Sequence, residues 1–112
     1  MKTSSFRLVR VLSAAALACG LSSLAHAQQQ SATQLHTRAT AAMCANCHGT
    51  DGRTTEGSAI PSLVGMPKDY MILQMKAFKD GTRPATVMHQ ITKGLTDAQI
   101  DTISSYYAGT KR

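Results

Sequence analysis

Apolar residues recur every three or four positions in three stretches of this chain, a spacing typical of amphipathic helices. These stretches lie near residues 32–43, 67–81 and 96–109, and no segment shows a convincing strand pattern. The apolar stripes are Leu35, Ala39 and Ala42; Tyr70, Leu73 and Ala77, beside Met71, Met75 and Phe78; and Ile100, Ile103 and Tyr107. The sequence therefore predicts an all-α fold with three main helices and long loops.

The expected ends of these helices rest on capping residues. A capping box of the Ser/Thr-x-x-Gln type begins at Ser31 for the first helix and at Thr96 for the last. Pro67 suits the first turn of the middle helix, and Gly81 suits its end. The stretch from Thr82 to Lys93 is expected to be a loop. Loops of this length are unusual in a small domain unless a cofactor packs them.

The first 27 residues have the three regions of a secretory signal peptide. A basic start, MKTSSFRLVR, precedes a short apolar run that ends in Ala25-His26-Ala27. We expect cleavage after Ala27, which leaves residues 28–112 as one domain in the periplasm without a membrane span. Lipidation at Cys19 is a minor alternative, because the residues before it match a lipoprotein box only in part.

Composition limits the remaining domain. Three of the twelve basic residues leave with the signal, so nine face six acidic residues, a net charge of +3. That balance, without a basic run, argues against nucleic-acid binding. Residues 28–112 contain four aromatic side chains, no Trp and only two cysteines. The domain thus needs something other than a disulfide framework to fill its core.

Those two cysteines belong to the motif Cys44-Ala-Asn-Cys47-His48. A thioredoxin-like dithiol would need a preceding strand, and structural zinc would need about four ligands, commonly in two pairs. Neither setting is present. Cys-x-x-Cys-His is the attachment signature of c-type haem: both thiols bond to the haem vinyl groups, and the histidine coordinates the iron. We therefore expect one covalently bound haem c per chain, with a dithiol or zinc site as the alternative.

The chain resembles class I c-type cytochromes, and more narrowly the short single-haem type found in the cytochrome subunit of flavocytochrome c sulfide dehydrogenase. The resemblance rests on the haem motif with Gly49, Asp51 and Gly52, and on residues 60–63, 70–83 and 87–97. It implies the class I cytochrome c fold, in which the helices and loops wrap around the haem. It also implies a role in electron transfer.

The second axial ligand of the iron is expected to be Met88. It follows His48 by 40 residues, lies between Pro84 and the last helix, and matches the ligand position of the resembling family. Met66, and His89 directly after Met88, stay open as alternative second ligands. The same resemblance implies that the carbonyl of Pro61 accepts a hydrogen bond from His48.

Together these observations predict an exported electron carrier rather than an enzyme. The expected partners are a periplasmic dehydrogenase, with a sulfide-oxidising flavoprotein as first choice, and a downstream electron acceptor. The alternative is a haem enzyme or gas-binding protein whose sixth coordination site is open. Basic residues of the middle helix and the following loop could form a positive rim for docking: Lys68, Lys76, Lys79, Arg83 and Lys93.

Overall fold

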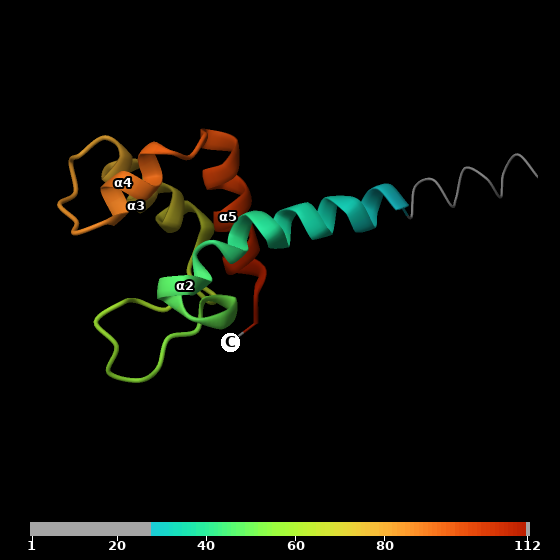
Figure 1. The fold of residues 1–112 in the computed structure, drawn as a ribbon, viewed down its shortest axis with the longest axis horizontal. Helices are drawn as coiled ribbons and strands as arrows, with labels where there is room; N and C mark the ends of the chain where they lie inside the picture. Colours follow the sequence, from blue (N-terminus) through green and yellow to red (C-terminus); the bar gives the residue numbers. More distant parts are fainter. Residues whose placement is uncertain (1–27, 112) are drawn as a thin grey trace, which may run out of the picture. The chain divides into compact units, whose positions relative to one another are not determined.

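The computed structural model describes residues 28–111, so the predicted signal peptide and Cys19 lie outside the described residues. Helical segments cover residues 28–42, α2 (Ala45–His48), the 3₁₀ turn η1 (Thr50–Gly52), α3 (Lys68–Lys79), α4 (Met88–Lys93) and α5 (Asp97–Gly109). No strand occurs within residues 28–111 (Figure 1). The prediction of an all-α fold is confirmed.

The chain divides into two units after Leu35, and the second unit, from His36 onward, contains the whole candidate site. The helix over 28–42 crosses this division. Its predicted start at a Ser31 capping box is wrong, because residues 28–31 are already helical. The Ser31 hydroxyl instead donates to the carbonyl of Gln28 at 2.9 Å, as serines inside helices often do.

The two helices that form the core follow the predicted pattern. Pro67 precedes α3, and Gly81, with φ of 77°, follows its C-cap residue Asp80. The start of α5 carries the predicted capping box: the Thr96 side chain accepts from the Gln99 backbone N–H, and the Gln99 side chain accepts from the Thr96 backbone N–H. Both caps satisfy backbone groups that a helix end leaves without partners.

The region predicted as a loop, Thr82 to Lys93, contains a short helix that the sequence did not indicate. Residues Met88–Lys93 form α4, which packs against α3. Thr92 is fully buried, and its hydroxyl donates to the carbonyl of Met88 at 2.8 Å. Six residues are too few to show a helical period, so tertiary packing decides this element.

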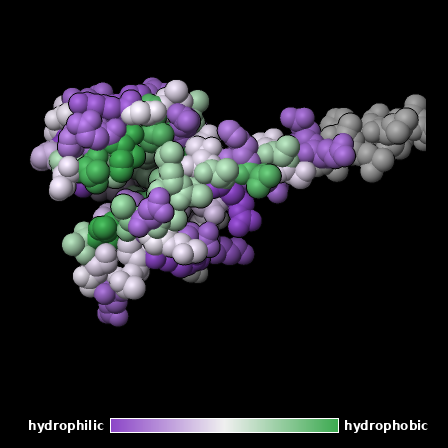
Figure 2. Space-filling model, in the orientation of Figure 1, coloured by the Kyte–Doolittle hydropathy of each residue, from purple (hydrophilic) through white to green (hydrophobic). Residues whose placement is uncertain are grey.

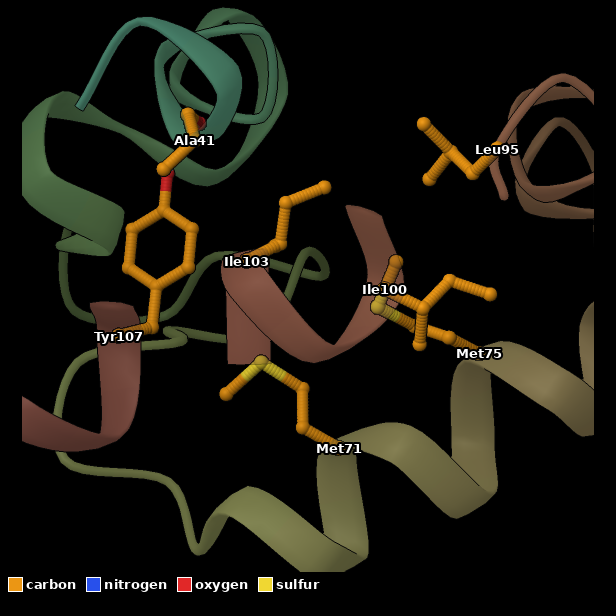
Figure 3. Close-up of a cluster of buried hydrophobic side chains, with 7 residues drawn as sticks. All are labelled: Ala41, Met71, Met75, Leu95, Ile100, Ile103 and Tyr107. Carbon is orange, nitrogen blue, oxygen red and sulfur yellow. The ribbon is translucent and has the colours of Figure 1, made fainter. Parts of the chain in front are cut away.

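The core lies between α3, α5 and the end of the 28–42 helix. Its buried members are Ala41, Met71, Met75, Leu95, Ile100, Ile103 and Tyr107 (Figure 3). Ile100 and Ile103 are completely inaccessible to water. Tyr107 donates its hydroxyl proton to the carbonyl of Ala41 at 2.8 Å, a bond across 66 residues of sequence. This contact ties the last helix to the segment that delivers the chain to Cys44.

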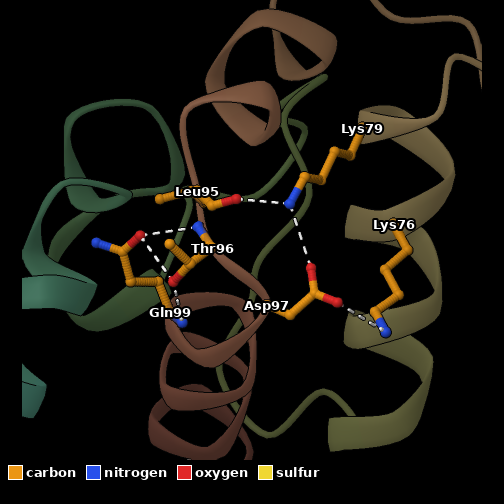
Figure 4. Close-up of polar contacts among 6 residues, drawn as sticks. All are labelled: Lys76, Lys79, Leu95, Thr96, Asp97 and Gln99. Atoms are coloured by element: carbon orange, nitrogen blue, oxygen red, sulfur yellow. Dashed lines mark hydrogen bonds and ion pairs between the residues drawn. The ribbon is translucent and has the colours of Figure 1, made fainter.

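Ion pairs join α3 to the beginning of α5. Lys79 donates to the Leu95 carbonyl at 2.7 Å and to Asp97, while Lys76 lies 3.5 Å from the other Asp97 oxygen (Figure 4). The hydrogen bond from Lys79 and the positive charges of both lysines lower the pKa of Asp97. Lys68 pairs with Asp101 at 2.7 Å.

These pairs change the predicted docking rim. Three of its five members lie against carboxylates of α5, and Arg83 donates to Gln74 while its guanidinium lies 4.5 Å from the centre of the Phe78 ring. The charges are partly neutralised within the chain, so they are weaker than expected as a means of attracting an acidic partner.

Candidate functional site

The haem-attachment motif lies on one helical turn. Cys44 is the N-cap of α2, and Cys47 and His48 are its last two residues. The Cys47 side chain is exposed, Cys44 is half-buried, and His48 is only 9% exposed. The two thiols are free of a disulfide bond. The turn therefore presents one accessible thiol, one sheltered thiol and a buried imidazole from five consecutive residues.

The imidazole of His48 is oriented by the loop that follows. Its Nδ1 lies 2.7 Å from the carbonyl oxygen of Pro61, and a carbonyl can only accept. Nδ1 must therefore carry the proton, which leaves the lone pair of Nε2 available for a metal. This is the arrangement that metal-ligating histidines usually have, and it is the contact that the resemblance implied.

The carbonyl of Gly52 anchors the three residues that follow Pro61. It accepts hydrogen bonds from the Leu63 N–H at 2.8 Å, the Val64 N–H at 3.2 Å and the Ser62 hydroxyl at 2.8 Å. Tyr106 also donates to Asp51, beside Gly52, at 3.2 Å. The segment around Pro61 is thereby anchored directly to the turn that follows His48.

Gly52 offers a sharp test of this anchor. Its φ is +75°, and a Cβ there would lie 2.7 Å from two ring carbons of Tyr107. Gly57 has φ of +77° but no heavy atom within 4 Å of such a Cβ. Both alanine variants carry the same backbone strain, so we expect Gly52→Ala to lower the free energy of unfolding by about 1–3 kcal/mol more than Gly57→Ala. Denaturant unfolding of the two variants measures this difference; equal losses would contradict the packing described.

The surroundings of Cys44 bear on the dithiol and zinc alternatives. Burial raises the pKa of its thiol, and this effect outweighs the lowering by a hydrogen bond with Tyr107. A reactive dithiol or a zinc ligand instead needs a stabilised thiolate. Within residues 28–111 no group of three or more His, Cys, Asp or Glu side chains could hold a metal ion. These surroundings do not favour the dithiol or zinc alternative.

The unit that contains this motif also exposes several large apolar side chains. Leu73 of α3 is 62% exposed, and Tyr70, Val87 and Ile91 are also large apolar side chains in contact with water. Figure 2 shows a patch of hydrophobic residues beside an indentation in the surface. A flat apolar cofactor suits such a surface, which a domain of this size would otherwise rarely expose.

Met88, the predicted second ligand, is the first residue of α4 and is half-buried. The alternative ligand Met66 packs against the core cluster, while Met71 and Met75 belong to the core itself. Next to Met88, the Nδ1 atom of His89 is buried and has no hydrogen-bond partner. The thioether of Met88 is the group on this short helix that could hold the iron of a cofactor.

The helices, the attachment turn and the oriented histidine define a c-type cytochrome. The family model for cytochrome c matches residues 36–111, and the chain belongs to this family. Proteins of the family carry covalently bound haem c and act as electron carriers, and this chain has the class I fold.

Three relatives illustrate the similarity. The cytochrome subunit of sulfide dehydrogenase from Chlorobaculum tepidum is 39% identical over 62% of this chain and 61% of that protein. Thiosulfate dehydrogenase electron acceptor from Thiomonas intermedia is 37% identical over 63% of this chain and 33% of its own length. The solved cytochrome c4 of Acidithiobacillus ferrooxidans is 38% identical, with a TM-score of 0.54 over 58% of this chain and 37% of that chain. The matched region thus spans about one to two thirds of these relatives.

Proposed function

We propose that this protein is an exported carrier of one electron at a time, with a haem attached through Cys44 and Cys47. His48 would bind the iron through Nε2, and Met88 would supply the second side-chain ligand. The observation that carries this proposal is the hydrogen bond from His48 Nδ1 to Pro61, because it fixes the tautomer and orientation that an iron ligand needs.

The chain's own contribution is to hold the cofactor with little rearrangement. When bound, the haem supplies an iron that gains and loses one electron. Two thioether links and the anchored loop around Pro61 limit movement on the His48 side. The bond from Thr92 to the Met88 carbonyl and the packing of α4 on α3 limit movement of Met88. The exposed apolar side chains of α3 and α4 would exclude water from the haem.

An iron without a free coordination site would distinguish this electron carrier from a haem enzyme or gas-binding protein with an open site. Methionine ligation occupies the sixth position and resists small ligands. We expect purified, exported protein to carry the mass of one haem and, when reduced, to leave added carbon monoxide unbound. Mass spectrometry and visible spectroscopy measure both. Rapid carbon monoxide binding by the folded protein would favour the open-site alternative, and protein without covalent haem would overturn the proposal.

The setting that we propose is the periplasm, with a dehydrogenase as electron donor and a further redox protein as acceptor. The predicted signal peptide over residues 1–27 supports export. Two relatives are named for roles with thiosulfate dehydrogenase and sulfide dehydrogenase. A sulfide-oxidising flavoprotein remains our first choice of donor. Within residues 28–111 no helix has the length and apolar character needed to span a bilayer.

A further inference from the structure

The residue after Pro61, Ser62, shares a peptide unit with the carbonyl that orients His48. That carbonyl lies 2.7 Å from His48 Nδ1, and it belongs to the unit that joins Pro61 to Ser62. Because a peptide unit is planar and rigid, the direction of the carbonyl is coupled to the orientation of the residue that follows it. The contacts that hold Ser62 therefore also hold the acceptor of the His48 bond.

Two hydrogen bonds to one acceptor hold Ser62. Its hydroxyl donates to the carbonyl of Gly52 at 2.8 Å, and the next backbone N–H, that of Leu63, donates to the same oxygen at 2.8 Å. The two donors lie on different branches from the Cα atom of Ser62. Either bond alone would let the residue turn about the remaining contact, whereas both together fix it and the peptide unit before it.

These bonds belong to a closed circuit that begins and ends at His48. The N–H of Gly52, which is buried, donates at 2.8 Å to the carbonyl of Gly49, the residue directly after His48. The Gly52 carbonyl accepts from Ser62, and the Pro61 carbonyl pairs with His48. The Ser62 hydroxyl is the member of this circuit that a substitution can remove without altering the backbone. A water molecule in its place could bind Gly52, but it would not be attached to the chain and would not hold Pro61.

We infer, on the basis of the proposed function, that Ser62 is a positioning residue that lowers the reduction potential of the haem. A carbonyl that accepts from Nδ1 makes the imidazole a more basic ligand. A more basic ligand favours ferric over ferrous iron, because ferric iron carries the larger positive charge. By holding the Pro61 carbonyl against Nδ1 of His48, the Ser62 hydroxyl stabilises the ferric state without touching the haem.

Three substitutions separate this role from a general effect on the loop. Ser62→Ala removes the hydroxyl and Ser62→Thr keeps it. Ser58→Ala is the matched control, because it removes from the same loop a hydroxyl that accepts from the Ile60 N–H. We expect Ser62→Ala to raise the equilibrium constant for reduction of the iron about two-fold to tenfold, the size of one hydrogen bond. The other two variants should stay near wild type in a spectroelectrochemical titration.

A second readout follows the hydrogen bond of His48 itself. Exchange of the Nδ1 proton with deuterated solvent, measured by NMR on the reduced protein, should be faster in Ser62→Ala than in the wild type and in Ser62→Thr. An unchanged potential or an unchanged exchange rate in Ser62→Ala would overturn the inference, as would a rise in potential that Ser62→Thr or Ser58→Ala shares. Absence of covalent haem from the wild type would instead count against the proposed function.

Discussion

The haem-free variant Cys44→Ala/Cys47→Ala is expected to be largely unfolded, with no cooperative thermal transition. The buried apolar core consists of a few side chains between α3, α5 and the residues near Ala41, and it includes two flexible methionines. The loop over residues 53–67 and the segment over 80–87 contain no helix. Ordering each residue costs roughly 1–2 kcal/mol of backbone entropy, which such a core offsets poorly.

The helices of the haem-free variant are too short to be stable without a packed core. The longest described in full, α3 and α5, have 12 and 13 residues. Isolated helices shorter than about 12–15 residues are marginal in water, and α3 and α5 lie at this limit. Far-ultraviolet circular dichroism should therefore show a large loss of helix in the double variant.

The single variant Cys47→Ala is the matched control, because Cys47 is exposed and one thioether link to Cys44 would remain. We expect it to retain haem and a cooperative melt. If the haem-free double variant also melts cooperatively with wild-type helix content, the polypeptide supplies its own core, and the structural role assigned to the haem is wrong.

Helices α3 and α5 could be predicted from the sequence because both are long enough for their apolar stripe to repeat several times. Their ends were predictable for a local reason: the Thr96 capping box and the positive φ of Gly81 depend on neighbouring residues alone. The attachment motif was predictable for the same reason, since all its chemistry lies within five consecutive residues.

Features that depend on distant residues were not predictable in this way. Helix α4 is short and is stabilised by packing against α3. The lysines of α3 form ion pairs with carboxylates of α5. The bond of Tyr107 to Ala41 crosses 66 residues, and nothing near Gly52 reveals that a tyrosine ring lies against it. The contact of Pro61 with His48 was predicted from the family resemblance rather than from the spacing of these residues.

Replacing Met88 by leucine should leave the haem covalently attached but open the sixth coordination site. Leucine has a similar volume, so the cost to stability should stay below about 1.5 kcal/mol, while the thioether sulfur is lost. We expect the oxidised protein to lose its sulfur-to-iron absorption band, the reduction potential to fall, and the reduced protein to bind carbon monoxide. Met88→Ala should do the same with a larger loss of stability, because it also removes packing.

Met66→Leu is the control for this experiment, since Met66 packs against the core and is the alternative methionine ligand. That variant should keep the band, the potential and the resistance to carbon monoxide. Retention of the band in Met88→Leu together with its loss in Met66→Leu would assign the ligand to Met66. In that case α4 would have to be explained by its packing on α3 alone.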